Sequence, residues 1–223
     1  MRRSYGEHAD QHVDVYAPED RRRAVVAVLH GGFWRAPYAS DLMDRLCADL
    51  AARGYEAWNV EYRRLGTGGG WPTTFDDVRA AVDGADGPLV TLGHSAGGHL
   101  ALWLAAERGA ALAVSQAGVV DLVEARRLGL SRRAAEELLG GTPDEVPDRY
   151  AAASPAARLP LGVPQLLVHG RRDDTVPAEM SRAYAEQARQ AGDVAELVET
   201  DEGHFDCLDP ASESWAAIVE RLP

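Results

Sequence analysis

The sequence predicts an α/β fold in which helices cover both faces of a mostly parallel sheet. Short apolar runs alternate with segments of helical periodicity along the 223 residues, which is typical of strand–helix–strand units. The run at residues 24–29 is apolar throughout, as expected for a strand buried on both faces. A Gly-x-Ser-x-Gly pattern at residues 93–97 lies between another such run and a helical pattern. Ligands bind at strand ends of this kind.

The composition fits one domain over residues 1–223, with a single sizeable core. Hydrophobic residues make up 46% of the chain, and no segment is long enough to span a bilayer. No apolar stretch follows the two N-terminal arginines, so the sequence predicts no signal peptide and a cytoplasmic location. Cys47 and Cys207 form neither a disulfide framework nor a metal-ligand spacing and are expected to be free thiols.

The charge and the residue types exclude several classes of chemistry. A net charge of −12 argues against nucleic acid or an anionic membrane as a partner. The chain contains no lysine, which excludes a phosphate-loop lysine, a Schiff-base lysine and a Ser-Lys dyad. The histidines are scattered without a metal-binding spacing, so we expect neither a metal nor another cofactor. The sequence predicts no particular oligomeric state.

The predicted elements follow one another in a regular order. Strands are expected at residues 12–17, 24–29, 55–61, 88–93, 111–115, 165–169 and 194–199. Helices are expected at residues 40–53, 75–85, 96–108, 178–190 and 211–222. Residues 21–23 are predicted to form a turn and residues 66–72 a loop. Ser40 is expected to cap the first helix, Thr74 with Asp77 to form a capping box, and Asp209 with Pro210 to start the last helix.

Residues 121–160 interrupt this alternation. The segment is partly helical and rich in charge, and it follows a predicted strand. We expect it to be a small cap insertion over the carboxyl ends of the strands, within the same domain.

Residues 93–97 predict a sharp turn that presents Ser95 at the end of a strand. In such a turn Ser95 takes a positive φ, which residues other than glycine rarely adopt. Side chains two residues to either side would collide, so the geometry requires Gly93 and Gly97. The alternative is an ordinary strand-to-helix turn in which Ser95 caps the helix.

A nucleophilic serine requires a base, and three histidines follow Ser95 in the sequence. His99 lies on the helix that begins at the serine, and His169 precedes the best carboxylate candidates. His204, just after the last predicted strand, is therefore the expected base. The alternative is a histidine on a surface loop.

The acid that orients this base is expected after the preceding strand, where Asp173 and Asp174 are adjacent. The spacing does not choose between them, and a role for both in capping the next helix is the alternative. A tetrahedral intermediate also needs two backbone N–H donors. These are expected from Ala96 and from Gly32 or Phe33, with His30 as a structural residue of that loop.

Three aromatic residues lie on loops that are expected near Ser95. Trp34, Trp71 and Phe205 are predicted to line a pocket for an acyl or aryl group. Trp103, inside the helix after Ser95, is expected to belong to the core.

The segments HGGFW, GHSAGGHL and the late GHF resemble the α/β-hydrolase superfamily along essentially the whole chain. Within it they are similar to the branch that contains small esterases and kynurenine formamidases. The segment HGRRDDTVP is similar to that branch as well and matches Asp173 to its acid. The resemblance implies Ser95 as nucleophile, His204 as base, and Gly32, Phe33 and Ala96 around the oxyanion.

We therefore expect a serine hydrolase that cleaves a small ester through an acyl-enzyme. An alternative is a formamidase-type amide hydrolase, which HGGFW and the nearby tryptophans favour. An alternative of another class is a binding protein that kept the fold without its catalysis.

Overall fold

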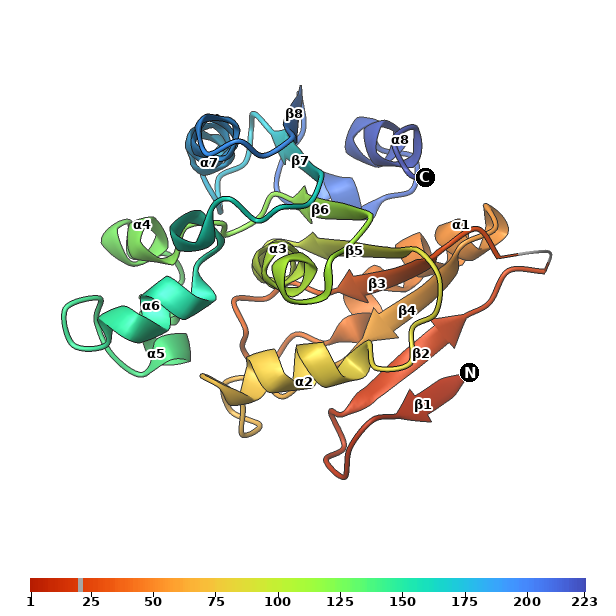
Figure 1. Ribbon diagram of the computed structural model, residues 1–223, viewed down its shortest axis with the longest axis horizontal. Helices are drawn as coiled ribbons and strands as arrows, with labels where there is room; N and C mark the ends of the chain where they lie inside the picture. Colours follow the sequence, from red (N-terminus) through yellow and green to blue (C-terminus); the bar gives the residue numbers. More distant parts are fainter. Residues whose placement is uncertain (20–21) are drawn as a thin grey trace.

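The computed structural model describes residues 1–19 and 22–223, and its centre is one eight-stranded sheet (Figure 1). The strand order is β1-β2-β4-β3-β5-β6-β7-β8. From β4 to β8 along this order, all neighbouring strands are parallel. Strand β2 is antiparallel to both of its neighbours, β1 and β4. The strands are β1 (Arg2–Ser4), β2 (His12–Tyr16), β3 (Val25–Leu29), β4 (Glu56–Val60), β5 (Leu89–His94), β6 (Leu112–Gln116), β7 (Gln165–Gly170) and β8 (Ala195–Thr200).

This architecture confirms the predicted fold class. Every predicted strand is present within one or two residues, and β3 is fully buried as its apolar run predicts. The sequence analysis missed β1, a three-residue edge strand that pairs with β2. The predicted turn at residues 21–23 includes Arg21, which lies outside the described residues.

Helices cover the two faces of the sheet unequally (Figure 1). On one face lie α1 (Asp44–Ala52), preceded by the 3₁₀ turn η1 (Ser40–Met43), and α8 (Glu213–Val219). On the other face lie α2 (Thr73–Ala81), α3 (Ala96–Arg108) and α7 (Ala178–Gln190). Helix α3 is the most central, and its residues from Ala96 to Ala105 are buried. Trp103 belongs to this core, as expected.

Two predicted helix starts are wrong because the residues expected to cap them have tertiary partners. Ser40 makes no side-chain cap; its backbone N–H donates to Glu61 in the buried 3₁₀ turn. Thr74 lies inside α2, where its hydroxyl accepts from the N–H of Gly70 and donates to the carbonyl of Arg63. Asp77 binds the Arg63 guanidinium instead of closing a capping box.

The ends of two helices also differ from their predictions. Helix α2 ends at Ala81 rather than at residue 85. The last helix begins at Glu213, where the Ser212 hydroxyl accepts from the N–H of Trp215 and so caps it. The turn at Asp209 belongs instead to the end of the 3₁₀ segment η3 (Asp206–Leu208).

The segment between β6 and β7 contains α4 (Leu122–Arg127), α5 (Ala134–Leu139), α6 (Pro147–Ala153) and the 3₁₀ turn η2 (Pro155–Arg158). It lies on the α3 face of the sheet (Figure 1). The carbonyls of Ala152 and Ala153 accept from Trp103 and His99 of α3. Arg35, from the loop after β3, pairs with Glu137 of α5. This insertion is thus attached to both the central helix and the loop after β3.

Within the described part of the chain, no helix is long and apolar enough to cross a bilayer.

Candidate active site

The turn between β5 and α3, residues 93–97, which we call the elbow, has the strained backbone that its glycines predict. Ser95 has φ +56° and ψ −117°, in the left-handed half of conformational space that is costly for a serine. A Cβ on Gly93 would collide with the carbonyl of Gly97, and one on Gly97 with the carbonyl of Leu29 at the end of β3. The prediction of a sharp turn that depends on both glycines is confirmed.

Ser95 lies at the carboxyl ends of the parallel strands, where β6, α3 and the loop after β6 each form a backbone hydrogen bond with it. Its N–H donates to the carbonyl of Gln116 on β6 at 2.8 Å. Its own carbonyl accepts from the N–H groups of His99 and Val119. The Ser95 side chain does not cap α3, so the alternative of a capping serine is wrong.

Asp173, on the loop after β7, is fully committed to hydrogen bonds. One carboxylate oxygen, Oδ1, accepts from the N–H groups of Thr175 and Val176, each at 2.8 Å. The other, Oδ2, accepts from His204 Nδ1 at 2.6 Å and from His169 Nε2 at 3.1 Å. Its side chain is fully buried. This carboxylate therefore has a fixed orientation toward two imidazole rings.

The environment favours the ionised form of Asp173. Burial by itself raises the pKa of the carboxyl, but hydrogen bonds from His169, His204 and the Val176 N–H outweigh burial and hold the pKa well below its ordinary value. Asp174 is exposed and only accepts from the Thr175 hydroxyl. The structure thus separates the two adjacent carboxylates that spacing alone left equivalent.

His169 is a contact of Asp173 that sequence reasoning did not assign. Its Nε2 faces two acceptors, the Asp173 carboxylate and the carbonyl of Val176, so Nε2 carries the proton. Its Nδ1 then accepts from the Ser181 hydroxyl at 2.7 Å. All of these side chains are buried. The four-residue spacing of His169 and Asp173 around a strand end was the available signal.

His204 lies on the segment that follows β8, residues 201–208, which we call the base loop. Because Nδ1 donates to Asp173, Nε2 is the nitrogen left to accept a proton. The carbonyl of His204 accepts from His94 Nε2 at 2.9 Å, and the two rings lie 4.7 Å apart. The base loop is thus bound directly to the residue that precedes Ser95, although the two lie 110 positions apart in the sequence.

Two further contacts fix the base loop. Gln116 Nε2 donates to the carbonyl of Cys207 at 3.0 Å, and the Cys207 thiol donates to the carbonyl of His204. Cys47 and Cys207 are both buried free thiols, as expected. His94 and Gln116 carry no role in the sequence analysis, although both stand at the ends of buried strands.

The loop after β3 has three consecutive residues with positive φ: Gly32 at +102°, Phe33 at +49° and Trp34 at +57°. Gly31 lies against the elbow, where a Cβ would come within 2.9 Å of His94 Nδ1 and 3.1 Å of the Ser95 Cβ. Within the described part of the chain, the N–H groups of Gly32, Phe33 and Ala96 donate to no backbone or side-chain acceptor.

His30 binds the backbone of this loop, and its hydrogen bonds leave it unavailable as a base. Its Nε2 lies 3.0 Å from Glu61 Oε1 and its Nδ1 lies 2.8 Å from the carbonyl of Gly31. The ring is fully buried and stacks on Tyr62. Glu61 also accepts from the N–H of Ser40. The structural role expected for His30 agrees with these contacts.

The three aromatic residues expected in a pocket lie in different environments. Trp34 has a positive φ, is fully buried and packs edge-on against His99. The prediction that Trp34 lines a pocket for an acyl or aryl group is wrong, because its side chain has no accessible surface. Trp71 is half-buried against Phe75, and its N–H donates to Leu138 of the insertion. Phe205 is 59% exposed, with its ring edge-on to His204.

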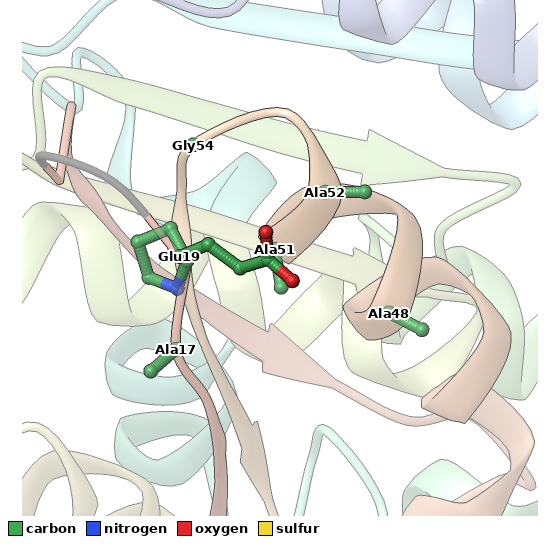
Figure 2. Close-up of a pocket in the computed structure, with 7 residues that line it drawn as sticks. Ala17, Glu19, Ala48, Ala51, Ala52 and Gly54 are labelled. Atoms are coloured by element: carbon green, nitrogen blue, oxygen red, sulfur yellow. The ribbon is translucent and has the colours of Figure 1, made fainter.

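A hollow of about 430 Å³ lies elsewhere on the molecule (Figure 2). Residues of α1, the turn after it and the segment after β2 line it, including Ala48, Ala51 and Gly54. Among the described residues that line it, Glu19 is the charged one, and its side chain lies across the hollow toward Ala51 (Figure 2). Gly54 precedes β4, so this hollow lies at the amino ends of the parallel strands, away from Ser95. Among the described residues there is also no cluster of side chains that could hold a metal ion.

Comparison with known proteins identifies relatives of this arrangement. The BD-FAE family model matches residues 13–187. Esterase LipC of Mycobacterium tuberculosis is 28% identical and aligns with 93% of this chain. The uncharacterized peptidase YtmA of Bacillus subtilis is 35% identical over 44% of this chain. The chain spans 60% of the length of LipC and 40% of that of YtmA.

Solved structures share the fold along nearly the whole chain. A truncated carbohydrate esterase from gut microbiota superimposes with a TM-score of 0.83 at 20% identity, covering 98% of this chain and 93% of that protein. Thermogutta terrifontis esterase 2 superimposes with a TM-score of 0.76 at 24% identity, covering 98% and 88%. The chain belongs to the BD-FAE family and has the α/β-hydrolase fold.

Proposed function

We propose that this member of the BD-FAE family is a serine hydrolase that cleaves a small ester through an acyl-enzyme. In this mechanism Ser95 is the nucleophile, His204 the general base and Asp173 the acid that orients it. One observation carries the proposal. Asp173, on the loop after β7, binds His204 at 2.6 Å, and the base loop that carries His204 is bound to His94, the residue before Ser95.

Each step of the proposed reaction uses a group with a defined state. His204 Nε2 takes the proton of the Ser95 hydroxyl as Oγ attacks the ester carbonyl carbon. The C–O bond of the ester then breaks, and the alcohol leaves with that proton. A water molecule attacks the acyl-serine with His204 again as base, which releases the carboxylic acid and restores Ser95. The ionised Asp173 stabilises the His204 imidazolium that forms during both acylation and deacylation.

The tetrahedral oxygen needs donors that are not already used. The N–H of Ala96, at the start of α3, and that of Gly32 or Phe33 meet this condition in the described chain. Each such donor typically contributes about 3 kcal/mol of transition-state stabilisation. The positive φ values of residues 32–34 support this role, because strained backbone persists where the surrounding structure holds it in place.

We further propose that the acyl group is short. Thermogutta terrifontis esterase 2, which shares the fold, is described with propionate bound and with butyrate bound. The formamidase alternative drew support from tryptophans near the loop after β3, and the burial of Trp34 removes part of that support.

Labelling with a fluorophosphonate probe and a panel of p-nitrophenyl esters test the proposal together. Wild type should react with the probe and hydrolyse acetyl, propionyl and butyryl esters. Ser95→Ala should lose labelling and lose hydrolysis by a factor on the order of 10⁵. The matched control is Ser115→Ala, which alters another buried serine, on β6, and should keep both activities.

Two results would overturn parts of the proposal. A folded wild type that neither labels nor hydrolyses any ester would favour a binding protein. Hydrolysis of N-formylkynurenine faster than of every ester in the panel would favour the formamidase.

A further inference from the structure

The buried ends of β5 and β6 carry two polar side chains that the proposed reaction does not use. His94 and Gln116 are directly opposite each other, as the last pair in the register of these two strands. Both are essentially inaccessible to solvent. Side chains alternate along a strand, so His94 shares a face with Val90 and Leu92, and Gln116 with Val114. That face is the one covered by α1 and α8.

Each of the two side chains donates a hydrogen bond to the base loop. His94 Nε2 lies 2.9 Å from the carbonyl of His204, and Gln116 Nε2 lies 3.0 Å from the carbonyl of Cys207. A carbonyl can only accept, so both nitrogens are donors. The base loop is therefore attached to the sheet at two points, one of them the backbone of the proposed base itself.

The same pair of residues also holds the nucleophile. Ser95 follows His94 directly, and its N–H donates to the carbonyl of Gln116 at 2.8 Å. The backbone of the pair His94 and Gln116 thus positions Ser95, and their side chains bind the base loop. The route between nucleophile and base through these contacts is short and runs over a rigid sheet.

We propose that His94 and Gln116 are positioning residues that hold the base loop against the elbow and so set where the His204 imidazole lies relative to Ser95. This inference rests on the proposed function for its kinetic consequence. Its structural consequence, that the base loop loosens without these donors, is independent of activity.

His94 is suited to a fixed contact rather than to proton transfer. Its Nε2 proton is used by the His204 carbonyl, and its Nδ1 lies against Gly31 without a polar partner in the described chain. Burial, followed by the charge of a protonated His204, lowers the pKa of His94 to about 3. The groups that face it are His204, Asp173 and His169. The ring is therefore neutral under all ordinary assay conditions, and the contact does not switch with pH.

His99, in the helix that follows His94 and Ser95, provides a matched control. It too is fully buried, its Nε2 lies 2.9 Å from a backbone carbonyl, and its Nδ1 has no polar partner in the described chain. Its acceptor, however, is Ala153 of the insertion and not the base loop. Replacing His99 removes the same kind of hydrogen bond without touching the proposed base.

The decisive variants remove or keep the donor at nearly constant volume. His94→Phe keeps a ring without an N–H, His94→Gln keeps an amide donor, and Gln116→Met keeps the chain length without a donor. We expect His94→Phe to lower kcat on p-nitrophenyl acetate about 10- to 100-fold, with KM changed by less than about twofold, because a displaced base slows chemistry without altering binding. Gln116→Met should lower kcat about tenfold, and His94→Gln should restore most of the rate.

Hydrogen exchange and thermal unfolding complete the test. Amides of residues 201–208 should exchange faster in His94→Phe and Gln116→Met than in wild type. The control His99→Phe should lower the melting temperature about as much as His94→Phe does. Its kcat and the exchange of its base-loop amides should stay at the wild-type values.

Three results would overturn the inference: wild-type kcat in folded His94→Phe, an equal loss of kcat in His99→Phe, or unchanged exchange of the base loop. If His94→Phe does not fold, Gln116→Met decides by the same criteria. An inactive wild type whose base loop loosens in these variants would contradict the proposed function alone.

Discussion

The two halves of the candidate site are held in place by different means. The nucleophile half, made of the elbow and the loop after β3, depends on strained backbone, with positive φ at Gly32, Phe33, Trp34 and Ser95. The acid–base half contains no such strain among its named residues and depends on side-chain hydrogen bonds, four of them to Asp173. Strain is tolerated only where close packing leaves no alternative, whereas hydrogen-bonded groups can be replaced one at a time.

This difference predicts that replacing a glycine of the nucleophile half threatens the fold, whereas replacing a hydrogen-bonded side chain of the acid–base half lowers the rate. The largest expected effect is that of Gly97→Ala. Its Cβ would collide with the carbonyls of Leu29 and His30 at the end of β3, and backbone in the middle of a sheet cannot yield. We expect a loss of more than about 4 kcal/mol in the free energy of unfolding, or no folded protein.

Denaturant unfolding of Gly97→Ala beside Gly109→Ala checks this expectation. Gly109 ends the same helix, α3, but is exposed and has open space at its Cβ, so only its positive φ of +71° opposes the change. That conformation costs a residue with a side chain about 1–2 kcal/mol. Equal losses in the two variants would mean that steric packing does not fix the elbow.

The next effect concerns Asp173 in the acid–base half. Asp173→Asn keeps the size of the side chain but removes the charge that stabilises the imidazolium of His204. We expect kcat on short esters to fall by roughly 10³- to 10⁴-fold, with the protein still folded. Steady-state kinetics measures the fall in kcat, and circular dichroism checks that the variant is folded.

Asp174→Asn is the matched control for this variant, since Asp174 is adjacent and exposed. Its kcat should stay within about twofold of wild type. Similar losses in both variants would exclude Asp173 as the acid that orients His204.

A pH dependence of stability is expected from two buried histidines, His94 at the end of β5 and His99 in α3. Burial lowers the pKa of His94 to about 3 and that of His99 to about 4, from an ordinary value of 6.5. Between these values the unfolded chain binds protons that the folded chain does not, so stability is complete above pH 6.5 and falls as the pH drops toward 4. Each histidine should contribute a slope of about 1.4 kcal/mol per pH unit.

Urea unfolding between pH 7 and pH 4 measures this slope. His99→Gln should reduce the slope by about 1.4 kcal/mol per pH unit, the share of one histidine, because glutamine does not titrate. A free energy of unfolding that stays constant over this range, in wild type, would show that the two rings are not excluded from water.

Most of the fold could be predicted from the sequence because its signals are local. Apolar runs gave the strands at the right places, and the glycines at 93 and 97 predicted the strained turn for the steric reason that the structure shows. The edge strand β1 was missed since three residues with no apolar pattern become a strand only by pairing with β2.

The errors and omissions in the site have a common origin in contacts distant along the chain. Thr74 and Asp77 match a capping box in sequence, yet Arg63 lies within reach of both and takes over their hydrogen bonds. Trp34 is buried against His99, a contact between separate segments that nothing in HGGFW specifies. His169 and His94 gained their partners only when the ends of separate strands met.

The thiol next to the proposed base gives the protein a natural reporter. Cys207 is buried and donates to the carbonyl of His204, and burial raises the pKa of its thiol far above the ordinary value. An alkylating dye can therefore reach this sulfur only during the moments when residues 201–208 lift from the sheet. The speed of that alkylation records how often the lifting happens, in the resting protein and without any substrate. Cys47, on the buried side of α1, supplies the internal reference for unfolding of the whole molecule.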